Sequence, residues 1–410
     1  GLTANGRFGE AVDINGTGDR IVVGAPDAGP NNGGQGVVAV YQNSSPWTQL
    51  GNYIFGDVYN DNFGRSVSIN LSGNRIAVGA PQYDVGSNNA DGLTRGYELS
   101  GDIWTQIGSD LVGEATLDNS GANISLNDDG NIIAIGARNN DGGGTNRGHV
   151  RVYSETGGTW SQLGSDIDGI ADNDNFGHSV VMNASGSRVA VGTNNTDNPG
   201  TGAGSVSIYE LSAGDWVQVG SDIYGSATGD ASGYDIDFNS AGDRIAIGAY
   251  GNDGAGTDSG QTRVYSESGA NWTQVGSDIY GVSAAVFSGY SVGLNAAGDR
   301  LAIGTYSRST VDIYYESGGT WSQLGSTLTQ TASGEYFGGY RNVKLNSVGD
   351  RVVIGSYNGY VDGAGNDGYA AVFSYSASGV NPSPSITPSI TTSISITPTI
   401  SITPTISITP

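Results

Sequence analysis

The sequence predicts an all-β fold, a seven-bladed β-propeller of four-stranded antiparallel blades followed by an extended C-terminal tail. Three observations support this prediction. The 410 residues include 69 glycines, and only 14% of residues are charged, which is typical of many short strands joined by tight turns. A motif first seen as Arg-Ile-Val-Val-Gly-Ala at residues 20–25 recurs in seven copies. Apolar and polar residues alternate between clusters of turn-forming residues, which favours strands over helices.

The repeat is regular enough to define seven structural units. Its glycines lie 51 to 57 residues apart, at Gly24, Gly79, Gly136, Gly192, Gly248, Gly304 and Gly355. A period of this length predicts one supersecondary unit per copy. Seven sheets arranged radially protect their edges, whereas the alternative, a linear solenoid, usually has shorter units.

Each unit is expected to hold four strands. The first two are clearest at residues 63–70 and 75–80, and the last two at residues 150–153 and 160–167. The seventh unit supplies only three, because no Trp-x-Gln segment follows residues 370–375. Its outer edge would be exposed and needs a cover. We place the propeller at residues 1–377 and the tail at residues 378–410.

Two short motifs in these units resemble a known repeat. Phe-Gly pairs begin at Phe8, Phe63, Phe176 and Phe337, and Gly-Ala-Pro triplets follow at residues 24–26 and 79–81. Together they resemble the FG-GAP repeat of integrin-α-like propellers over roughly residues 1–377. The Asp-rich calcium loop of integrins is not matched, because a short turn such as residues 15–19 joins the first two strands. Integrin-type metal sites therefore do not carry over.

Composition excludes several classes of function. The formal net charge of -24 repels phosphate backbones, which argues against nucleic-acid binding. The chain has no cysteine, so it has no disulfide framework, thiolate nucleophile or cysteine zinc site. No apolar run is long enough to span a membrane. The chain begins at Gly1 without a leader, as expected of a processed mature form or an incomplete sequence.

Candidate modification and metal sites fall on opposite faces of the predicted disc. Most Asn-x-Ser/Thr triplets lie in turns on one face, and we predict N-glycosylation at Asn15, Asn43, Asn70, Asn183, Asn194 and Asn271; a seventh triplet, at Asn123, falls inside a strand. Acidic, glycine-rich loops gather on the other face, where the candidate Ca²⁺ ligands are Asp141, Asp253, Asp258, Asp362 and Asp367. The alternative is that Asn, Asp and Gly simply form good loops.

No catalytic set stands out from the repeat. His149 and His178 are the only histidines, and each fills a position that ordinary residues fill in other units. The chain is therefore predicted not to be an enzyme. The recurring arginines are expected to have one structural role per blade, such as pairing with Asp166, Asp222 or Asp278; they are Arg20, Arg75, Arg188, Arg244, Arg300 and Arg351.

The tail has a strict period of two. From Ser383 to Thr409 every odd position is Ser or Thr, and every even position except Thr392 is Ile or Pro. In an extended chain the prolines all spoil one edge and leave the other free to pair. The tail also resembles the Ser/Thr/Pro-rich stalks of cell-wall and mucin-like glycoproteins, which implies O-glycosylation at Ser385, Thr387, Ser389, Thr391, Ser393, Ser395, Thr397, Thr399, Ser401, Thr403, Thr405, Ser407 and Thr409. A disordered linker is the alternative.

These patterns favour a secreted, extracellular or cell-surface structural glycoprotein. A tail segment would cover the open edge of the seventh blade, either in cis or donated by a neighbouring copy, and donation from copy to copy would build a filament head to tail. The alternative function is an adhesion module that binds a glycan or a protein through the acidic loops, with Ca²⁺.

Overall fold

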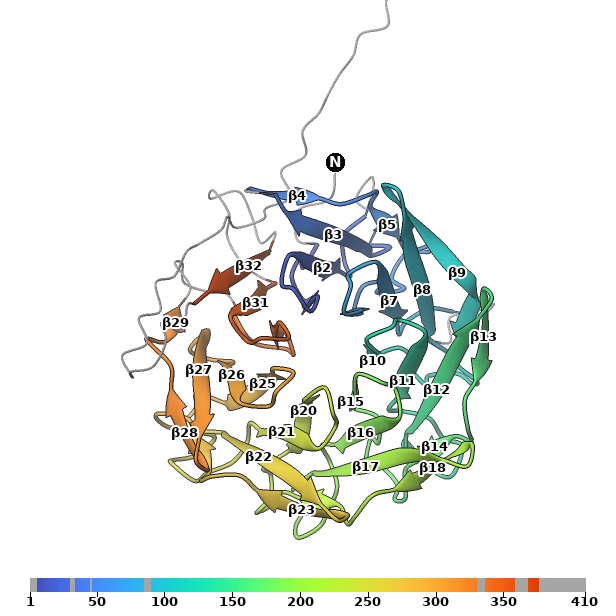
Figure 1. Ribbon diagram of the computed structural model, residues 1–410. Coiled ribbons are helices and arrows are strands. Elements are labelled where there is room, and N and C mark those ends of the chain that lie inside the picture. Colours follow the sequence, from blue (N-terminus) through green and yellow to red (C-terminus); the bar gives the residue numbers. More distant parts are fainter. Residues whose placement is uncertain are drawn as a thin grey trace, which may run out of the picture.

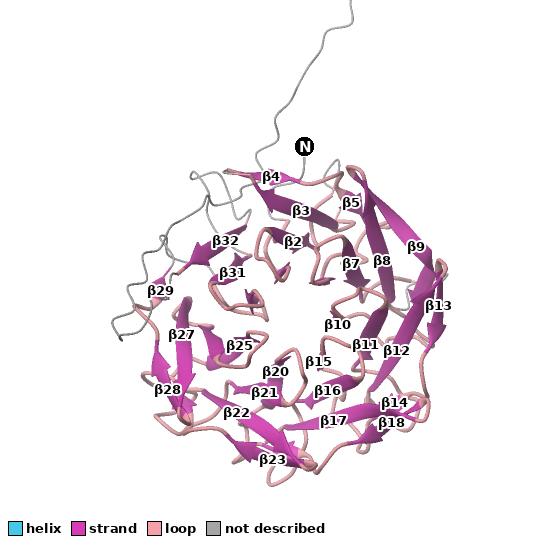
Figure 2. Cartoon of the chain, viewed as in Figure 1, coloured by secondary structure: helices cyan, strands magenta, loops and turns pink. Residues whose placement is uncertain are grey.

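The computed structural model describes residues 6–29, 34–44, 46–84, 90–329, 336–357 and 368–375. Every regular element among them is a strand, and the strands form seven sheets around a central channel (Figures 1 and 2). The predicted fold, a seven-bladed β-propeller with four-stranded antiparallel blades, is confirmed. None of the described residues forms a helix with the length and hydrophobicity needed to cross a bilayer.

Strands follow one another outward from the channel within each blade. The first three blades comprise β1 (Ala11–Ile14), β2 (Arg20–Ala25), β3 (Val37–Asn43), β4 (Trp47–Gln49) and β5 (Ile54–Phe55); β6 (Ser66–Ile69), β7 (Arg75–Ala80), β8 (Leu93–Ser100) and β9 (Ile103–Val112); and β10 (Asn123–Leu126), β11 (Ile132–Ala137), β12 (His149–Thr156), β13 (Thr159–Gln162) and β14 (Ile167–Asp168).

The remaining blades repeat this order. They comprise β15 (Ser179–Met182), β16 (Arg188–Thr193), β17 (Ser205–Ser212), β18 (Asp215–Gln218) and β19 (Ile223–Tyr224); β20 (Ser232–Phe238), β21 (Arg244–Ala249), β22 (Gln261–Ser268), β23 (Asn271–Gln274) and β24 (Ile279–Tyr280); β25 (Ser288–Leu294), β26 (Arg300–Thr305), β27 (Thr310–Ser317), β28 (Thr320–Gln323) and β29 (Leu328–Thr329); and β30 (Val343–Leu345), β31 (Arg351–Ser356) and β32 (Tyr369–Ser374). In five blades the fourth strand is split into two segments that both pair with the third strand.

The recurring glycine is explained by the packing of one blade on the next. The second strand of every blade is buried along its length after its first residue. A methyl group added to any of the seven repeat glycines would lie 2.0 to 2.3 Å from the carbonyl oxygen of the Gly that begins the next blade, as at Gly24 and Gly64. Only a residue without a side chain permits this approach.

The Phe of the Phe-Gly pair belongs to the core. Phe8, Phe63 and Phe176 are buried, and each packs edge-on against a third-strand Tyr with ring centroids 6.2 to 6.4 Å apart. Such edge-to-face pairs add to the stabilisation from buried apolar area. The Phe-Gly motif is therefore a packing motif here.

The recurring arginines join neighbouring blades, but their partners differ from those predicted. Arg188 donates to the carbonyl oxygen of Gly242, which lies in the first hairpin turn of the next blade, at 3.1 Å. Arg20, Arg244 and Arg351 bond in the same way. The predicted partners Asp166 and Asp278 pair instead with the third-strand arginines Arg151 and Arg263, because the repeat arginines begin strands at the other end of the blade. Asp222 accepts a hydrogen bond from Ser207.

The seventh blade holds three strands among the described residues, in the order β30, β31, β32. The description of this blade ends at Tyr375, directly after β32. The boundary at residue 377 and the whole tail, with its predicted O-glycosylation sites, lie outside the described residues.

Candidate functional site

The residue after the Phe-Gly or Ser-Gly pair lies at or near the start of the innermost strand of each blade. These residues lie on the loop face, which we define as the face that carries the loops between second and third strands and the crossovers between blades. Contacts between non-adjacent blades show that their side chains reach the axis. Arg65 of the second blade lies over the ring of Tyr340 in the seventh, 5.9 Å from its centroid. Arg341 of the seventh blade donates to the carbonyl oxygen of Tyr234 in the fifth at 3.0 Å.

Tyrosines from the fifth to seventh blades form one continuous arc at this end of the channel. We call it the tyrosine arc, and its members are Tyr234, Tyr250, Tyr290, Tyr306, Tyr336, Tyr340 and Tyr357. Ring centroids are 4.5 Å apart between Tyr234 and Tyr290, 4.8 Å between Tyr290 and Tyr306, and 5.0 Å between Tyr306 and Tyr336. All but Tyr357 are half-buried, so parts of their rings meet solvent.

Arg138 and His178 lie beside the tyrosine arc. Arg138 makes no hydrogen bond or ion pair with any residue that the structure describes, and burial together with nearby Arg65 lowers its pKa. His178 is 8% exposed, and neither of its ring nitrogens has a hydrogen-bond partner. Its ring centroid lies 4.9 Å from that of Tyr234. Burial, with Arg341, Arg138 and Arg65 close by, holds the pKa of His178 well below its usual value, so the imidazole is neutral.

Few carboxylates balance the arginines of the channel mouth. Glu10 lies 3.1 Å from Arg65 and 2.9 Å from Arg7, and Asp235 lies 3.9 Å from Arg341. Burial raises the pKa of Asp235 to about 6 and also raises that of Glu10. The mouth therefore carries local positive charge on half-buried arginines in a chain whose formal net charge is -24. Arg138 and His178 together offer donors and no acceptor carboxylate of their own, as an anion requires.

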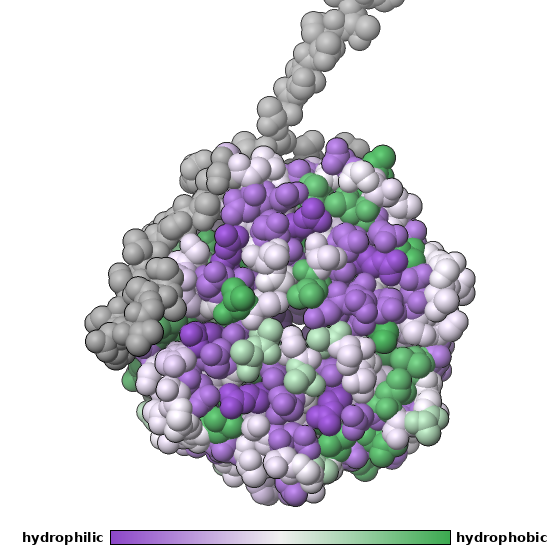
Figure 3. Space-filling model, viewed as in Figure 1, coloured by the Kyte–Doolittle hydropathy of each residue, from purple (hydrophilic) through white to green (hydrophobic). Residues whose placement is uncertain are grey.

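The other end of the channel is a cavity of about 170 Å³, lined by Asp13, Ser68, Ser125, Asp237 and Lys344 among others. A narrow opening is visible at the centre of the disc (Figure 3). Lys344 lies 3.0 Å from Asp237, and burial raises the pKa of Asp13 to about 6. These acids bond to the backbone of the next blade, as when Asp13 accepts from the N–H of Ile69 and Asp237 from that of Leu294. They hold blades together.

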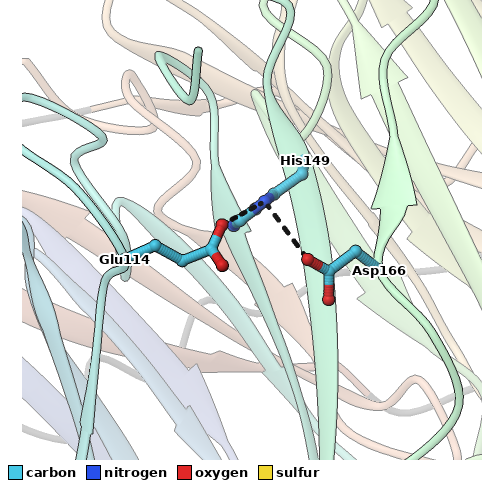
Figure 4. Close-up of side chains that lie close together, drawn as sticks. All are labelled: Glu114, His149 and Asp166. Carbon is cyan, nitrogen blue, oxygen red and sulfur yellow. Dashed lines mark ion pairs between the residues drawn. The ribbon is translucent and has the colours of Figure 1, made fainter. Parts of the chain in front are cut away.

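One further cluster contains three side chains able to ligate a metal. Nδ1 of buried His149 lies 3.7 Å from Glu114 and 4.0 Å from Asp166 (Figure 4), and this is the one such group among the described residues. Arg151, however, forms ion pairs with both carboxylates. Burial and Arg151 lower the pKa of His149.

The same ion-pair arrangement recurs without a histidine. In the second blade Arg95 pairs with Asp110 at 2.8 Å and with Asp57 of the preceding blade at 2.5 Å. The Glu114–Arg151–Asp166 group therefore joins neighbouring blades, and its carboxylates already have a cation.

The predicted calcium ligands among the described residues make hydrogen bonds within their own loops. Asp141 accepts a hydrogen bond from the backbone N–H of Asn146, and Asp253 accepts one from that of Asp258. None of the three belongs to a group of ligating side chains among the described residues. Asp362 and Asp367 lie outside the described residues.

The structure separates the predicted N-glycosylation sites into two kinds. Asn15, Asn70 and Asn183 are 2 to 4% exposed, and Oδ1 of each accepts two backbone hydrogen bonds within the first hairpin turn. These three amides hold their own turns together, and N-glycosylation at them stays a prediction. The same Asn recurs in the turns of the other blades, where it lacks the triplet, as at Asn127.

The other three predicted N-glycosylation sites do not lie in first hairpin turns. Asn271 is exposed at the start of β23, and Asn43 and Asn194 are half-buried. Oδ1 of Asn194 is buried without a hydrogen-bond partner. Of the six, Asn271 is therefore the one whose side chain is freely reached.

The sequence did hold a signal for the channel mouth. Tyr250, Tyr306 and Tyr357 stand where the first two repeats have the Pro of Gly-Ala-Pro, and Tyr234 and Tyr290 follow Ser-Gly where earlier repeats have Phe-Gly. The two kinds of replacement occur in consecutive blades. Because consecutive blades are neighbours in the ring, these tyrosines lie side by side. Reasoning from single motifs missed this proximity.

Comparisons show what this fold resembles. Neither a family model nor a curated protein matches the chain. Similar solved structures include hydrazine synthase of Kuenenia stuttgartiensis, with 10% identity, a TM-score of 0.60, and 90% of this chain and 96% of that one covered. The periplasmic gluconolactonase of Pseudomonas aeruginosa has 13% identity and a TM-score of 0.56, with 83% and 88% covered. A protein of Bacteroides uniformis assigned as a 6-phosphogluconolactonase has 11% identity and a TM-score of 0.54, with 78% and 85% covered.

At these identities the likeness shows the fold alone. It nevertheless corrects one prediction. The prediction that the chain is not an enzyme is contradicted by these neighbours, since two of them are named as lactonases that share its architecture.

Proposed function

We propose that the channel mouth binds a small anionic carbohydrate. The observation that carries this proposal is the buried imidazole of His178, whose ring nitrogens have no hydrogen-bond partner, beside the half-buried Arg138, for which the described residues supply no hydrogen-bond or ion-pair partner. Buried polar groups are almost always satisfied, so these two point to a partner that the chain itself does not supply.

The surroundings favour an anionic group attached to a carbohydrate. A guanidinium binds carboxylate or phosphate oxygens through two parallel N–H bonds. The rings of the tyrosine arc offer apolar faces on which the C–H face of a sugar can lie, and their hydroxyl groups can bond the sugar hydroxyls. Burial raises the pKa of Tyr306 to about 12 and raises that of Tyr234, so both stay protonated donors near neutral pH.

The neighbours in structure add support of a weaker kind. Two of them are named for gluconolactone and its 6-phosphate, which are lactones of sugar acids. We base the proposal on the residues of the mouth, and the names only suggest which sugar acids to test first.

Calorimetric titration tests the proposal. Gluconate and 6-phosphogluconate are expected to bind, and glucose, which lacks the charge, to bind at least tenfold more weakly. Arg138→Met should weaken binding of the acids by about tenfold or more, as expected for loss of a charge-assisted hydrogen bond. Arg147→Gln is the matched control, because Arg147 pairs with Asp172 in an outer loop. Equal binding of glucose, or undiminished binding by Arg138→Met, would refute the proposal. Incubation with gluconolactone in the same experiment shows whether a bound lactone is hydrolysed.

The wider role proposed from the sequence rests on other residues. We propose an extracellular surface glycoprotein, supported by the exposed Asn-x-Thr triplet at Asn271 and by the alternating Ser/Thr tail. Kinship with the FG-GAP repeats is likewise a proposal, supported by the buried Phe-Gly pairs. The intact mass of the protein from its natural source, compared with 41.8 kDa for the polypeptide, tests the glycoprotein role. Head-to-tail assembly through the tail stays a prediction, because the tail lies outside the described residues.

A further inference from the structure

One position of the repeat contacts the innermost strands of two blades at the channel mouth. It is the residue directly after the second strand of each blade. Tyr250 holds this position in the fifth blade, and its ring centroid lies 4.7 Å from that of Tyr234 in the same blade and 4.9 Å from that of Tyr290 in the next. Tyr306 holds it in the sixth blade and lies 4.8 Å from Tyr290. A side chain at this position therefore lies between the inner-strand residues of its own blade and the next.

Arg138 and Asn194 hold the same position in the third and fourth blades, directly after β11 and β16. The inner-strand residue of the fourth blade is His178, which follows Phe-Gly as Tyr234 follows Ser-Gly. The repeat therefore places Arg138 on one side of His178 and Asn194 on the other. In agreement, the charge of Arg138 is one of the causes that lower the pKa of His178.

These three side chains leave different hydrogen-bonding groups unused. Neither ring nitrogen of His178 has a hydrogen-bond partner, and Oδ1 of Asn194 is buried without one. An arginine only donates, a neutral imidazole donates through one nitrogen, and an amide oxygen only accepts. A carboxylate satisfies the guanidinium of Arg138 but has no proton to give to Asn194. Because a buried acceptor without a partner is costly, the ligand is expected to carry a donor as well.

A hydroxyl group beside the carboxylate meets this need. It can accept from the N–H of His178 and donate to Oδ1 of Asn194 at the same time. Because a single imidazole separates Arg138 from Asn194, the hydroxyl must lie close to the carboxylate. The carbon next to the carboxylate is the nearest position that can carry it.

We propose that the channel mouth selects 2-hydroxy acids and that Asn194 is the residue that recognises the hydroxyl. This inference rests on the proposed function, which it narrows from anionic carbohydrates to those with a hydroxyl on the carbon next to the acid group. Discrimination follows from the unpaired acceptor, since an acid without that hydroxyl leaves Oδ1 of Asn194 buried and unsatisfied.

Calorimetric titration with gluconate and 2-deoxygluconate, which lacks the 2-hydroxyl, tests the inference. The full chain is produced without glycans, because residues 194–196 form a predicted N-glycosylation triplet. The wild type is expected to bind gluconate about tenfold more tightly than the deoxy acid, or better. Asn194→Leu keeps the side-chain volume and removes the amide, so it should bind both acids as the wild type binds 2-deoxygluconate. That shared affinity also shows that the variant is folded.

Asn195→Leu is the matched control. Asn195 is exposed, and its amide donates to the carbonyl oxygen of Asn173. This variant should retain the preference for gluconate.

The comparison of the two acids in the wild type needs no variant. If both acids bind equally while glucose binds at least tenfold more weakly, the proposed function stands and the role of the 2-hydroxyl is wrong. If neither acid binds better than glucose, the proposed function fails and this inference fails with it. A preference for gluconate that persists in Asn194→Leu would mean that another residue recognises the hydroxyl, which overturns the assignment to Asn194.

Discussion

The guanidinium of Arg351 donates a hydrogen bond of 2.6 Å to the carbonyl oxygen of Gly18, and so joins the last blade to the first. The bond repeats the one that Arg188 makes to Gly242 inside the ring. Ring closure thus uses the same side-chain contact as the interfaces between blades that adjoin in sequence.

Replacing Arg351 should loosen this closure. Arg351→Met keeps most of the side-chain volume but removes the donor, and loss of a hydrogen bond that involves a charged group costs about 1.5–3 kcal/mol. Thermal unfolding of Arg351→Met should therefore begin at a lower temperature. Arg147→Met is the control, because the ion pair of Arg147 with Asp172 is exposed and such pairs contribute about 0–1 kcal/mol. Equal Tm values for the two variants would show that the Arg351 bond does not stabilise the ring.

Two asparagines with the same triplet are expected to behave differently. Asn183→Ala leaves the backbone N–H groups of Ser187 and Arg188 without their acceptor, and a buried unsatisfied group costs about 1–3 kcal/mol. Asn271 is exposed, and Asn271→Ala should leave Tm unchanged within error. Thermal unfolding of both unglycosylated variants measures the difference. A loss of stability in Asn271→Ala alone would contradict the assignment of structural roles.

His178 makes stability depend on pH. Its pKa in the folded state lies below the usual 6.5, so the unfolded chain binds the proton more readily. The stability that neutral His178 contributes is present above about pH 6.5 and is lost as pH falls below it. His178→Phe removes this dependence. Its free energy of unfolding, relative to the wild type, should rise as pH falls from about 7.5 to 5.5, by up to about 1.4 kcal/mol per pH unit.

Denaturant unfolding at several pH values measures this effect of His178. Tyr250→Phe, which changes the same region but no group that titrates in this range, serves as the control and should follow the wild type. Parallel profiles for His178→Phe and the wild type would mean that the imidazole is not held neutral.

Arg151 should determine whether the cluster of Glu114, His149 and Asp166 binds metal. In the wild type Arg151 neutralises both carboxylates, and Zn²⁺ is expected to leave Tm unchanged. Arg151→Met frees the carboxylates beside the imidazole of His149, a ligand set that suits Zn²⁺, so added Zn²⁺ should raise Tm. In Arg151→Met combined with Glu114→Gln the increase should disappear. If Zn²⁺ raised the Tm of the wild type equally, Arg151 would not be what keeps the metal from the two carboxylates.

The architecture was predictable because every blade repeats the same local rules. The motif that ends at Gly24 specifies a buried second strand, and the close approach to Gly64 makes glycine necessary at that position in each copy. The three strands described in the seventh blade were likewise predictable, since no Trp-x-Gln segment follows β32. The alternation of apolar and polar residues, the turn residues and the repeat spacing are local properties, and they were sufficient to predict the blades.

The chemistry of individual residues was less predictable. The triplet at Asn183 predicted a glycan, whereas the hairpin turn uses that amide for its own hydrogen bonds. Asp166 was expected to pair with a second-strand arginine, but Arg151 on the third strand lies nearer. Burial and the choice among several possible partners depend on where elements lie in space, which the repeat pattern alone does not specify.

The sequence by itself determined the number of blades and the strands that the structure describes within each, because these follow from a pattern inside one repeat. Only the tertiary structure decided that Arg65, Arg138 and His178 meet the tyrosine arc. These residues come from different repeats, at least 40 residues apart, and each is an ordinary substitution within its own copy. Closure of the ring turns equivalent positions into neighbours, and their combined charge and aromatic surface exist only once the ring is closed.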